Sequence, residues 1–370
     1  MAIVKLAEVC EKIGSGATPR GGKEAYCDEG ISLVRSQNVL DFNFSKEGLA
    51  FINDEQAKKL SNVEVHSGDV LLNITGDSVA RACLMDDDYL PARVNQHVAI
   101  IRGNSHKIMN GYVLYYLQWR KEYLLQLASA GATRNALTKA MIEQLELDLP
   151  PLDSQQQIVA ILDSLQSKIQ LNQKTNDNLQ QQAQAIYSSM FIDNPDPAWS
   201  HGHLSDLITV KYGKDHKKLA DGIYPVYGSG GIMRYVERPL YNKESVLIPR
   251  KGTLNNVMYV NQPFWSVDTM FYTEMKLPNV AKFVYHFVKA KDLASMNAGS
   301  AVPSMTTDIL NAMEVVIPSA SALEEFESLV APMYEAMEAN DVQSKALSQM
   351  RDTLLPKLMS GEIDVSDIQL

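Results

Sequence analysis

Two stretches of the chain repeat an apolar residue at spacings that alternate between four and three positions. The first stretch starts at Ile158 and the second at Phe326, 168 positions later. A sustained 3.5-residue repeat predicts a coiled-coil seam, because it keeps the apolar positions of a supercoiled helix on one side. The predicted seam positions are Ile158, Leu162, Leu165, Ile169, Asn176, Leu179, Ile186, Val330, Met333, Met337, Asn340, Leu347, Leu354 and Leu358.

The two stretches belong to a longer internal repeat. Residues 128–150 align with residues 296–318 without a gap, and Thr138 coincides with Thr306. Two unrelated amphipathic helices would account for the periodicity, but they would not account for a shared offset that continues outside the helices. We therefore predict a duplicated unit, in which a globular part is followed each time by a long helix.

The predicted helices start with similar polar patterns. Asp153 precedes Gln156 by three positions, and Ser321 precedes Glu324 by three positions. A short polar residue followed three positions later by Glu or Gln is the pattern of a capping box, which satisfies free amides at a helix start. We expect both helices to begin at these residues.

Each globular part contains short apolar runs separated by glycine-rich turns. Residues 68–85 resemble residues 244–260, since each has a strand-like run, a glycine and a second short run. A late helix is predicted over residues 112–127 and over residues 280–290. The predicted fold class is mixed α/β (α+β): two similar domains separated by two long antiparallel helices that form a coiled-coil spacer, with a pseudo-two-fold internal repeat.

The length of 370 residues also favours more than one domain. The predicted division is residues 1–150 for the first globular domain, 151–194 for the first helical region, 195–318 for the second globular domain and 319–370 for the second helical region.

The two helices are expected to pair in antiparallel fashion, because the chain between them passes through the second globular domain. If the numbers of paired residues add up to 516, each seam residue lies opposite another, and Asn176 lies opposite Asn340. Such an asparagine pair would select one register at some cost in stability. Leu165 would lie opposite Arg351, which places an apolar residue against a charged one. This pair is tolerable if the aliphatic part of the arginine packs in the seam and its guanidinium reaches solvent.

The charge of the chain is uneven. The formal net charge is −10, which by itself argues against a free-standing nucleic-acid binder. Residues 198–318, however, carry +3 and residues 319–370 carry −7. The acidity of the second helical region suits a solvated or protein-facing helix and leaves the second globular domain mildly basic.

Cellular location is inferred from segments that the sequence lacks. No apolar run reaches the length of a membrane span, and the first residues do not have the layout of a signal peptide. Cys10, Cys27 and Cys83 have no metal-ligand spacing and fit a reducing compartment. We expect a cytoplasmic protein with no membrane partner.

The repeated elements resemble a known family. Residues 135–191 resemble the conserved helical region of the specificity (S) subunits of type I restriction–modification systems, and residues 67–102 are similar to the core of their target recognition domains. Residues 354–365, at the end of the chain, also resemble this family. The resemblance covers essentially the whole chain.

The resemblance implies a subunit that binds double-stranded DNA and is not an enzyme. Each recognition domain would read one half of a bipartite sequence, and the helices would set the spacing and dock two methyltransferase (modification) subunits. Endonuclease/translocase (restriction) subunits would join for DNA cleavage. S-adenosylmethionine would belong to the methyltransferase partner, and ATP and magnesium to the endonuclease partner, so no cofactor and no metal are expected on this chain.

Polar loop residues are the candidates for contacts with DNA. Arginine or lysine suits guanine, asparagine or glutamine suits adenine, and other polar groups bind phosphates. The candidates are Arg20, Lys23, Arg35, Gln37, Asn38, Arg81, Arg93, Arg134, Asn135, Lys214, His216, Lys217, Lys218, Tyr227, Ser229, Arg234, Arg250, Lys251, Thr253, Asn255 and Asn256. A solvated loop is the alternative for each residue alone, and residues 250–256 form the densest cluster. Asn95 and Gln96 are instead expected to satisfy backbone groups at the start of a strand.

Two other classes of function remain open. A coiled-coil adaptor could join two protein partners without reading DNA, and it would need apolar patches on the loops. An autonomous DNA enzyme would need a cofactor loop and a catalytic motif. Residues 14–24 do not match the phosphate-loop template, and residues 193–199 lack the double proline of the adenine methyltransferase motif.

Overall fold

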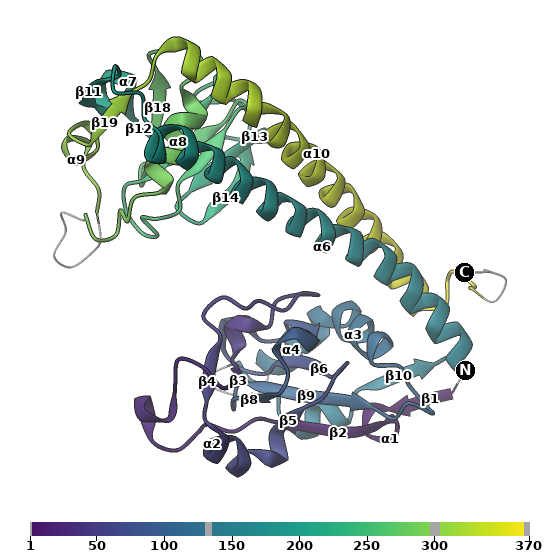
Figure 1. Cartoon of the computed structure of the whole chain (residues 1–370). Helices are drawn as coiled ribbons and strands as arrows, with labels where there is room; N and C mark the ends of the chain where they lie inside the picture. The colour runs from purple at the N-terminus through teal and green to yellow at the C-terminus, as the bar shows by residue number, and fades with distance from the viewer. Residues whose placement is uncertain (1, 130–134, 297–303, 366–370) are drawn as a thin grey trace. The chain divides into compact units, whose positions relative to one another are not determined.

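The structure is a computed structural model of the 370-residue chain, and it describes residues 2–129, 135–296 and 304–365. The chain forms two compact units, residues 1–173 with 341–370 and residues 174–340. Each unit contains one globular domain and part of both long helices (Figure 1).

The units cut through both long helices, whereas the predicted division separates the helices from the globular domains. Apolar packing explains the difference. Ile158 and Leu358 belong to the same hydrophobic core as the first globular domain. Tyr187 and Phe326 belong to that of the second. Each end of the helix pair is therefore part of the core that it adjoins.

The first globular domain consists of ten strands and several short helices within its described residues. Its elements are β1 (Ala2–Lys5), α1 (Leu6–Val9), β2 (Cys10–Ser15), η1 (Gly22–Ala25), β3 (Ile31–Val34), η2 (Ser36–Asn38), β4 (Ala50–Ile52), α2 (Asp54–Lys59), η3 (Ser61–Val63), β5 (Glu64–Val65), β6 (Val70–Asn73), η4 (Gly76–Ser78), β7 (Ala82–Leu84), η5 (Asp87–Tyr89), β8 (Ala92–Val94), β9 (Val98–Gly103), α3 (Asn110–Trp119), α4 (Lys121–Ser129), α5 (Lys139–Glu143) and β10 (Glu146–Leu149).

The second globular domain repeats this order with fewer elements. Its elements are β11 (Ser200–His203), α7 (Leu204–Leu207), β12 (Ile208–Tyr212), β13 (Asp221–Gly228), β14 (Gly231–Val236), β15 (Ser245–Pro249), β16 (Met258–Val260), β17 (Trp265–Ser266), β18 (Met270–Met275), α8 (Ala281–Lys289), α9 (Thr307–Asn311) and β19 (Glu314–Ile317).

The sheets of the two domains have corresponding topologies. The order β2-β9-β6-β7 in the first domain matches β12-β18-β15-β16 in the second. The order β4-β3-β8-β5 matches β14-β13-β17, and β3 and β13 each pair in parallel with their neighbours β8 and β17. The terminal strands pair as β1-β10 and β11-β19. The mixed α/β fold and its internal repeat are thus present in the structure.

Details of the backbone extend the repeat. The Leu6 amide donates to the Leu145 carbonyl at 2.8 Å, and the Leu204 amide donates to the Met313 carbonyl at 2.8 Å. The hydroxyl of Thr138 caps α5, and the hydroxyl of Thr306 caps α9 in the same way. The pairs Leu145 with Met313 and Thr138 with Thr306 confirm the offset of 168 that the sequence predicts.

The helix predicted over residues 112–127 is two helices, because α3 ends at Trp119 and Arg120 forms its C-cap. Helix α3 is buried from Tyr112 to Gln118, and six of these seven residues are apolar or aromatic, which suits a helix surrounded by core. Its Tyr115 hydroxyl donates to Asp163 Oδ1 at 2.6 Å and so connects the domain to the first long helix. The second late helix is observed at α8, within the range predicted for it.

Helix α8 connects the second domain to both long helices. The buried His286 ring places Nδ1 2.8 Å from Gln184 Oε1 and Nε2 2.9 Å from the Tyr334 hydroxyl. Burial lowers the pKa of His286 to about 4. The imidazole is therefore neutral near pH 7 and holds the two helices through one donor and one acceptor.

The long helices are α6 (Leu152–Ser188), which continues into a π-helical turn at Ser189–Asp193, and α10 (Ala320–Met359). The capping-box predictions are wrong. Ser319 caps α10, since its hydroxyl accepts from the Ala322 amide at 3.2 Å, and Ser321 lies inside the helix. Asp153 lies in the first turn of α6, where its negative charge interacts favourably with the positive end of the helix dipole.

The predicted antiparallel register is confirmed by side-chain hydrogen bonds. Asn340 Nδ2 donates to Asn176 Oδ1 at 2.8 Å within the second unit. Within the first unit, Asn172 Nδ2 donates to Ser344 Oγ at 3.1 Å, a pair whose numbers also add up to 516. The two polar layers are one helical turn apart along α6, and each belongs to a different unit.

The other seam positions are buried or half-buried. The buried ones are Ile158, Leu162, Ile169, Val330 and Leu358, and the half-buried ones are Leu165, Leu179, Ile186, Met333, Met337, Leu347 and Leu354. Arg351 donates to Gln166 Oε1 at 2.6 Å, and its guanidinium lies 4.1 Å from the centre of the Phe42 ring. A polar partner and an aromatic face therefore hold the arginine that interrupts the apolar pattern.

Candidate nucleic-acid interface

Three turns meet at one end of each globular domain, and the same backbone hydrogen bonds join them in both. We call residues 16–20, 74–78 and 95–97 the first loop end. Its equivalent, the second loop end, comprises residues 213–217, 250–254 and 267–269.

The backbone bonds establish this equivalence turn by turn. In the first loop end the Ile74 amide donates to the His97 carbonyl at 3.0 Å. In the second, the Arg250 amide donates to the Thr269 carbonyl at 2.9 Å. Arg250 therefore occupies the position of Ile74, which is buried in the first domain.

Glycines permit the close approach of these turns. A Cβ atom on Gly16 would lie 2.1 Å from the Val94 carbonyl oxygen, and one on Gly213 would lie 2.0 Å from that of Val267. Gly76 and Gly252 have φ angles of +74° and +88°, which favour glycine. The two loop ends thus share their backbone requirements.

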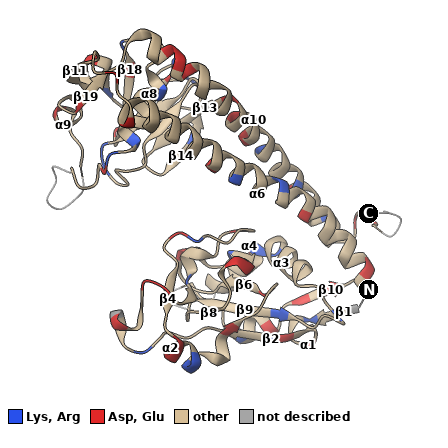
Figure 2. Cartoon of the chain, viewed as in Figure 1, with Lys and Arg blue, Asp and Glu red and all other residues tan. Residues whose placement is uncertain are grey.

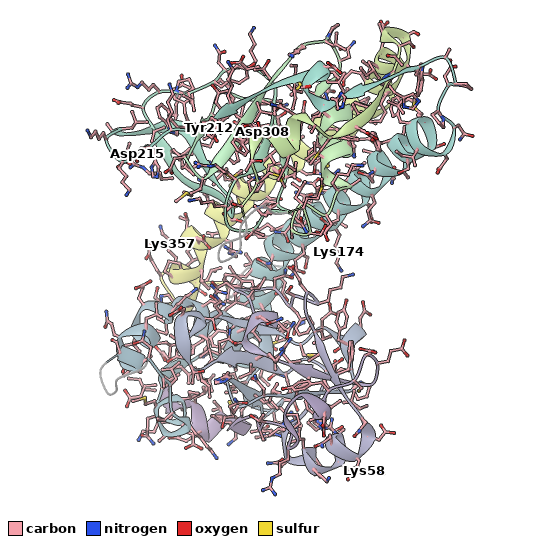
Figure 3. The ribbon with its side chains drawn as sticks, turned by 90° about the vertical axis from the view of Figure 1, so that its left-hand side faces the viewer. Lys58, Lys174, Tyr212, Asp215, Asp308 and Lys357 are labelled. Carbon is pink, nitrogen blue, oxygen red and sulfur yellow. The ribbon has the colours of Figure 1, made fainter. Side chains whose placement is uncertain are left out.

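The second loop end gathers positive charge. Lys214 and Lys217 are exposed in the turn after β12, with the exposed Lys218 next to them, and Lys251 is exposed after β15. The exposed carboxylates of Asp215 and Asp268 lie in the same loop end. The Arg250 guanidinium lies 5.4 Å from the centre of the Tyr212 ring. Tyr212 and Asp215 are labelled on this domain in Figure 3. Exposed cations of this density suit phosphate groups.

Part of the predicted cluster at residues 250–256 has a structural role instead. Asn255 Nδ2 donates to Asp292 Oδ1 at 3.0 Å, and its Oδ1 accepts from the Ala294 amide. Asn256 Nδ2 donates to the Ser229 carbonyl at 2.8 Å. Thr253 and Lys251 are the exposed members whose side chains lie at the second loop end. The two asparagines fix the shape of the turn.

Three further candidates of the second domain are engaged within it. Arg234 forms an ion pair with Asp221 at 2.7 Å. Tyr227 is 9% exposed, and its hydroxyl accepts from Gln262 Nε2 at 3.4 Å. Ser229 is half-buried and supplies the carbonyl that holds Asn256. His216 is half-buried in the turn after β12.

Two predictions in the first domain are wrong because the side chains are buried. Asn38 is 0% exposed, and its amide holds the carbonyls of Ser45 and Glu47. Arg93 is 8% exposed and lies 3.5 Å from the Glu64 carboxylate. Neither side chain can reach a DNA base in this conformation.

Arg35 and Gln37 lie outside the first loop end. Arg35 is half-buried, and both side chains donate to the Gly48 carbonyl. They stabilise the long connection between β3 and β4 through a shared acceptor.

The remaining candidates of the first domain are Arg20, Lys23, Arg81, Arg134 and Asn135. Arg20 is exposed within the first loop end, and Asn135 is exposed beside it, where the Gly76 amide donates to its carbonyl at 3.2 Å. Arg81 is half-buried after η4. Lys23 lies in η1, and Arg134 lies outside the described residues.

The structure also brings together four polar side chains. Of these the sequence pointed only to Gln96, which was expected to satisfy a backbone group and instead contacts two side chains. Thr18, Thr75, Gln96 and His97 come from all three turns of the first loop end and are hydrogen-bonded to one another. Asn95, as expected, satisfies a backbone group, since its Oδ1 accepts from the His97 amide at 3.0 Å. The one signal in the sequence for this group of side chains was that Gln96 lies in the short turn between two strands.

The described part of the chain has neither a metal-ligand cluster nor a membrane-spanning helix. Residues 2–129, 135–296 and 304–365 contain no group of three or more His, Cys, Asp or Glu side chains placed to hold a metal ion. Within the same ranges no helix is both long and apolar enough to cross a membrane.

Comparison with known proteins defines the family. The family described as type I restriction modification DNA specificity domain matches residues 1–181 and again residues 198–326. These two matches cover most of the chain, and each contains one loop end. The chain belongs to this family.

Individual relatives match over nearly the whole length. The type I restriction enzyme MjaIX specificity subunit of Methanocaldococcus jannaschii is 24% identical over 413 residues, which cover 99% of this chain and 94% of that protein. The HindI specificity subunit of Haemophilus influenzae is 21% identical, with 90% and 94% covered. The crystal structure of a type I restriction-modification S subunit from M. genitalium has a TM-score of 0.60 at 15% identity, over 97% of this chain and 96% of that chain. It has the same fold.

Proposed function

We propose that this chain is the DNA-reading subunit of a type I restriction–modification complex. The observation that carries the proposal is the pair of loop ends, which share a backbone and differ in side chains, in a chain of this family. Each loop end would bind one half of a bipartite DNA sequence. Different side chains on one backbone are what two unlike half-sites require.

The paired helices would act as the spacer between the half-sites. The seam is continuous through α6 and α10, and the asparagine pair selects a single register. A fixed register gives a fixed length, which is the property that a spacer needs.

The helices would also dock the partner subunits. Helix α10 carries acidic residues along its length, and residues 319–370 have a net charge of −7 (Figure 2). This charge suits basic protein surfaces rather than DNA. We propose two methyltransferase subunits as the partners, with endonuclease/translocase subunits joining them. The methyltransferase would bring S-adenosylmethionine, and the endonuclease would bring ATP and magnesium, so this chain would catalyse no step.

The test is to map methylated adenines in cells that express the chain with its candidate methyltransferase. We expect a bipartite motif with an unspecified gap. Inserting seven residues after Gln173 and seven before Asp341 adds ~10 Å to both helices at ~1.5 Å per residue. At ~3.4 Å per base pair, the gap should lengthen by about three.

The matched control inserts seven residues into α6 alone. This insertion shifts one side of the seam by two turns and leaves the other in place, so methylation should be lost. Absence of any motif, with the methyltransferase active beside another specificity subunit, would contradict the proposal and favour an adaptor.

A further inference from the structure

The four polar side chains of the first loop end form a continuous hydrogen-bonded chain. The Thr18 hydroxyl donates to Gln96 Oε1. Gln96 Nε2 lies 2.9 Å from His97 Nε2, and His97 Nδ1 lies 2.6 Å from Thr75 Oγ1. Gln96 is exposed, whereas His97 and Thr75 are half-buried behind it. An exposed glutamine is thus held from two sides.

The donors and acceptors of this chain are mutually consistent. A neutral imidazole has one N–H donor and one acceptor nitrogen. If the Gln96 amide donates to His97 Nε2, the proton of the ring lies on Nδ1 and is donated to Thr75. Each contact therefore uses one donor and one acceptor, and no charged group is needed.

The two contacts leave part of the hydrogen-bonding capacity of the Gln96 carboxamide unused. A carboxamide has two N–H donors and two oxygen lone pairs. Thr18 occupies one lone pair and His97 occupies one N–H, so one donor and one acceptor remain. Rotating the amide by half a turn exchanges the roles of the two neighbours but leaves the same remainder. In both orientations of the amide, Gln96 therefore keeps one free N–H and one free oxygen lone pair.

One donor beside one acceptor matches adenine. In the major groove adenine presents the N7 acceptor and the N6 amino donor, and glutamine contacts both at once. We propose that Gln96 reads an adenine in the half-site bound by the first globular domain, with Thr18 and His97 as positioning residues. This inference rests on the proposed function of the chain.

The surroundings of Gln96 favour contact with DNA. Arg20 is exposed in the turn that carries Thr18, so the first loop end includes a solvent-facing cation. The equivalent end of the second domain is the one that gathers exposed lysines. A phosphate contact by Arg20 would bring the DNA backbone to this end of the first domain, with base edges within reach of Gln96.

The equivalent position in the second domain has a different chemistry. The Val98 amide donates to the Asn95 carbonyl at 3.1 Å, and the Met270 amide donates to the Val267 carbonyl at 2.9 Å. These bonds place Asp268 where the first domain has Gln96. An ionised aspartate only accepts hydrogen bonds, so it lacks the donor that adenine N7 needs. The adenine assignment applies to the first half-site.

The first experiment maps methylation by the complex that contains Gln96→Glu. The glutamate loses the N–H donor, so we expect the rate at the original motif to fall about 5- to 150-fold. Discrimination should relax at one adenine of the first half-site, and the second half-site should stay unchanged. Gln126→Glu, an exposed glutamine on α4 of the same domain, is the matched control and should leave the motif and rate unaltered.

The positioning role has its own readout. His97→Phe removes the ring nitrogens, and we expect it to relax discrimination at the same adenine while the thermal midpoint of the complex changes little. Relaxation at a different base pair, or at none, would overturn the role assigned to His97.

The second experiment measures binding of the complex to DNA in which that adenine is replaced by 7-deazaadenine, which lacks N7. Wild-type binding should weaken, and binding by Gln96→Ala should not weaken further. Additive losses would overturn the inference, as would an unchanged motif in Gln96→Glu. If the wild-type complex shows no bipartite motif at all, the proposed function itself fails.

Discussion

The turn after β6 in the first domain and the turn after β15 in the second have the same backbone connections and different side chains. The Leu137 amide reaches the Ile74 carbonyl at 2.8 Å, and the Met305 amide reaches the Arg250 carbonyl at 2.9 Å. Backbone bonds depend little on side-chain identity. Thr75 and Lys251 can therefore occupy equivalent places, and the two domains can present different chemistry on one scaffold.

The side chains also differ in how they are held. In the first loop end, Gln96 is fixed by neutral partners from other turns. In the second, exposed lysines lie around Arg250, and Asn255 and Asn256 shape the turn. The first end therefore holds a neutral polar group in place, whereas the second presents exposed cations.

The largest loss of stability is expected at the two glycines that permit the close approach of the turns, Gly16 in the first domain and Gly213 in the second. Gly16→Ala and Gly213→Ala each place a Cβ within about 2 Å of a carbonyl oxygen, so each should cost about 3 kcal/mol of folding free energy. Thermal and urea unfolding would measure the loss. Gly14→Ala and Gly230→Ala meet no atom within 4 Å and are the matched controls. Tolerance of either loop-end variant would break the equivalence of the domains.

A smaller effect should distinguish the helix contacts of the two domains. The pKa of His286 is about 4 in the folded state, against 6.5 for an ordinary histidine. As pH falls, the unfolded chain therefore takes up the proton first. The contribution of neutral His286 to the free energy of unfolding is complete above pH 6.5. It is lost progressively between pH 6.5 and 4, by about 2 kcal/mol at pH 5.

Thermal unfolding of the second unit at pH 7 and pH 5 tests this expectation. His286→Asn should be less stable at pH 7 but should lose less on acidification. His201→Asn, a change at an exposed histidine, should keep the wild-type pH dependence. In the first domain the corresponding contact between α3 and α6 is made by Tyr115 and Asp163 and involves no histidine. The pH dependence due to His286 should therefore be confined to the second unit. An equal loss in both units would argue against His286 as the cause.

The polar layers of the seam should respond more weakly. Asn340→Leu leaves Asn176 facing an apolar side chain and should cost about 1 kcal/mol. The double variant with Asn176→Leu should recover most of that loss, while selecting the register less strongly. Denaturant unfolding gives the energies, and a cysteine crosslink between the helices reports the register. A double variant whose cost equals the sum of the two single variants would indicate no coupling.

The smallest effect concerns one charge at the loop ends. Lys251→Ala should weaken DNA binding by the complex about equally for all sequences and reduce the slope of log affinity against log salt by about 1. Thr75→Ala, at the equivalent place in the first domain, should leave the salt slope unchanged. Equal slopes for Lys251→Ala and wild type would remove Lys251 from the phosphate contacts.

Sequence patterns predicted the elements that depend on periodicity. The 3.5-residue repeat indicated both long helices, and the shared offset indicated the duplicated domains. The asparagine pair could be predicted because, in an antiparallel helix pair, the residue numbers of all facing pairs have the same sum. Once the apolar residues fix that sum, the partner of Asn176 follows. Helix starts were less predictable: the capping-box pattern indicated Ser321, whereas in the structure the Ser319 hydroxyl accepts from the Ala322 amide.

The sequence by itself determined the two helices, their antiparallel register and the repeated α/β domains, because these features follow from local patterns and a constant offset. The tertiary structure alone decided which polar loop side chains are available. Asn38 is buried by partners up to nine positions away, while Thr18 and Gln96 meet although 78 positions separate them. Whether a polar group faces solvent or a partner depends on such contacts between distant residues, and composition does not contain them.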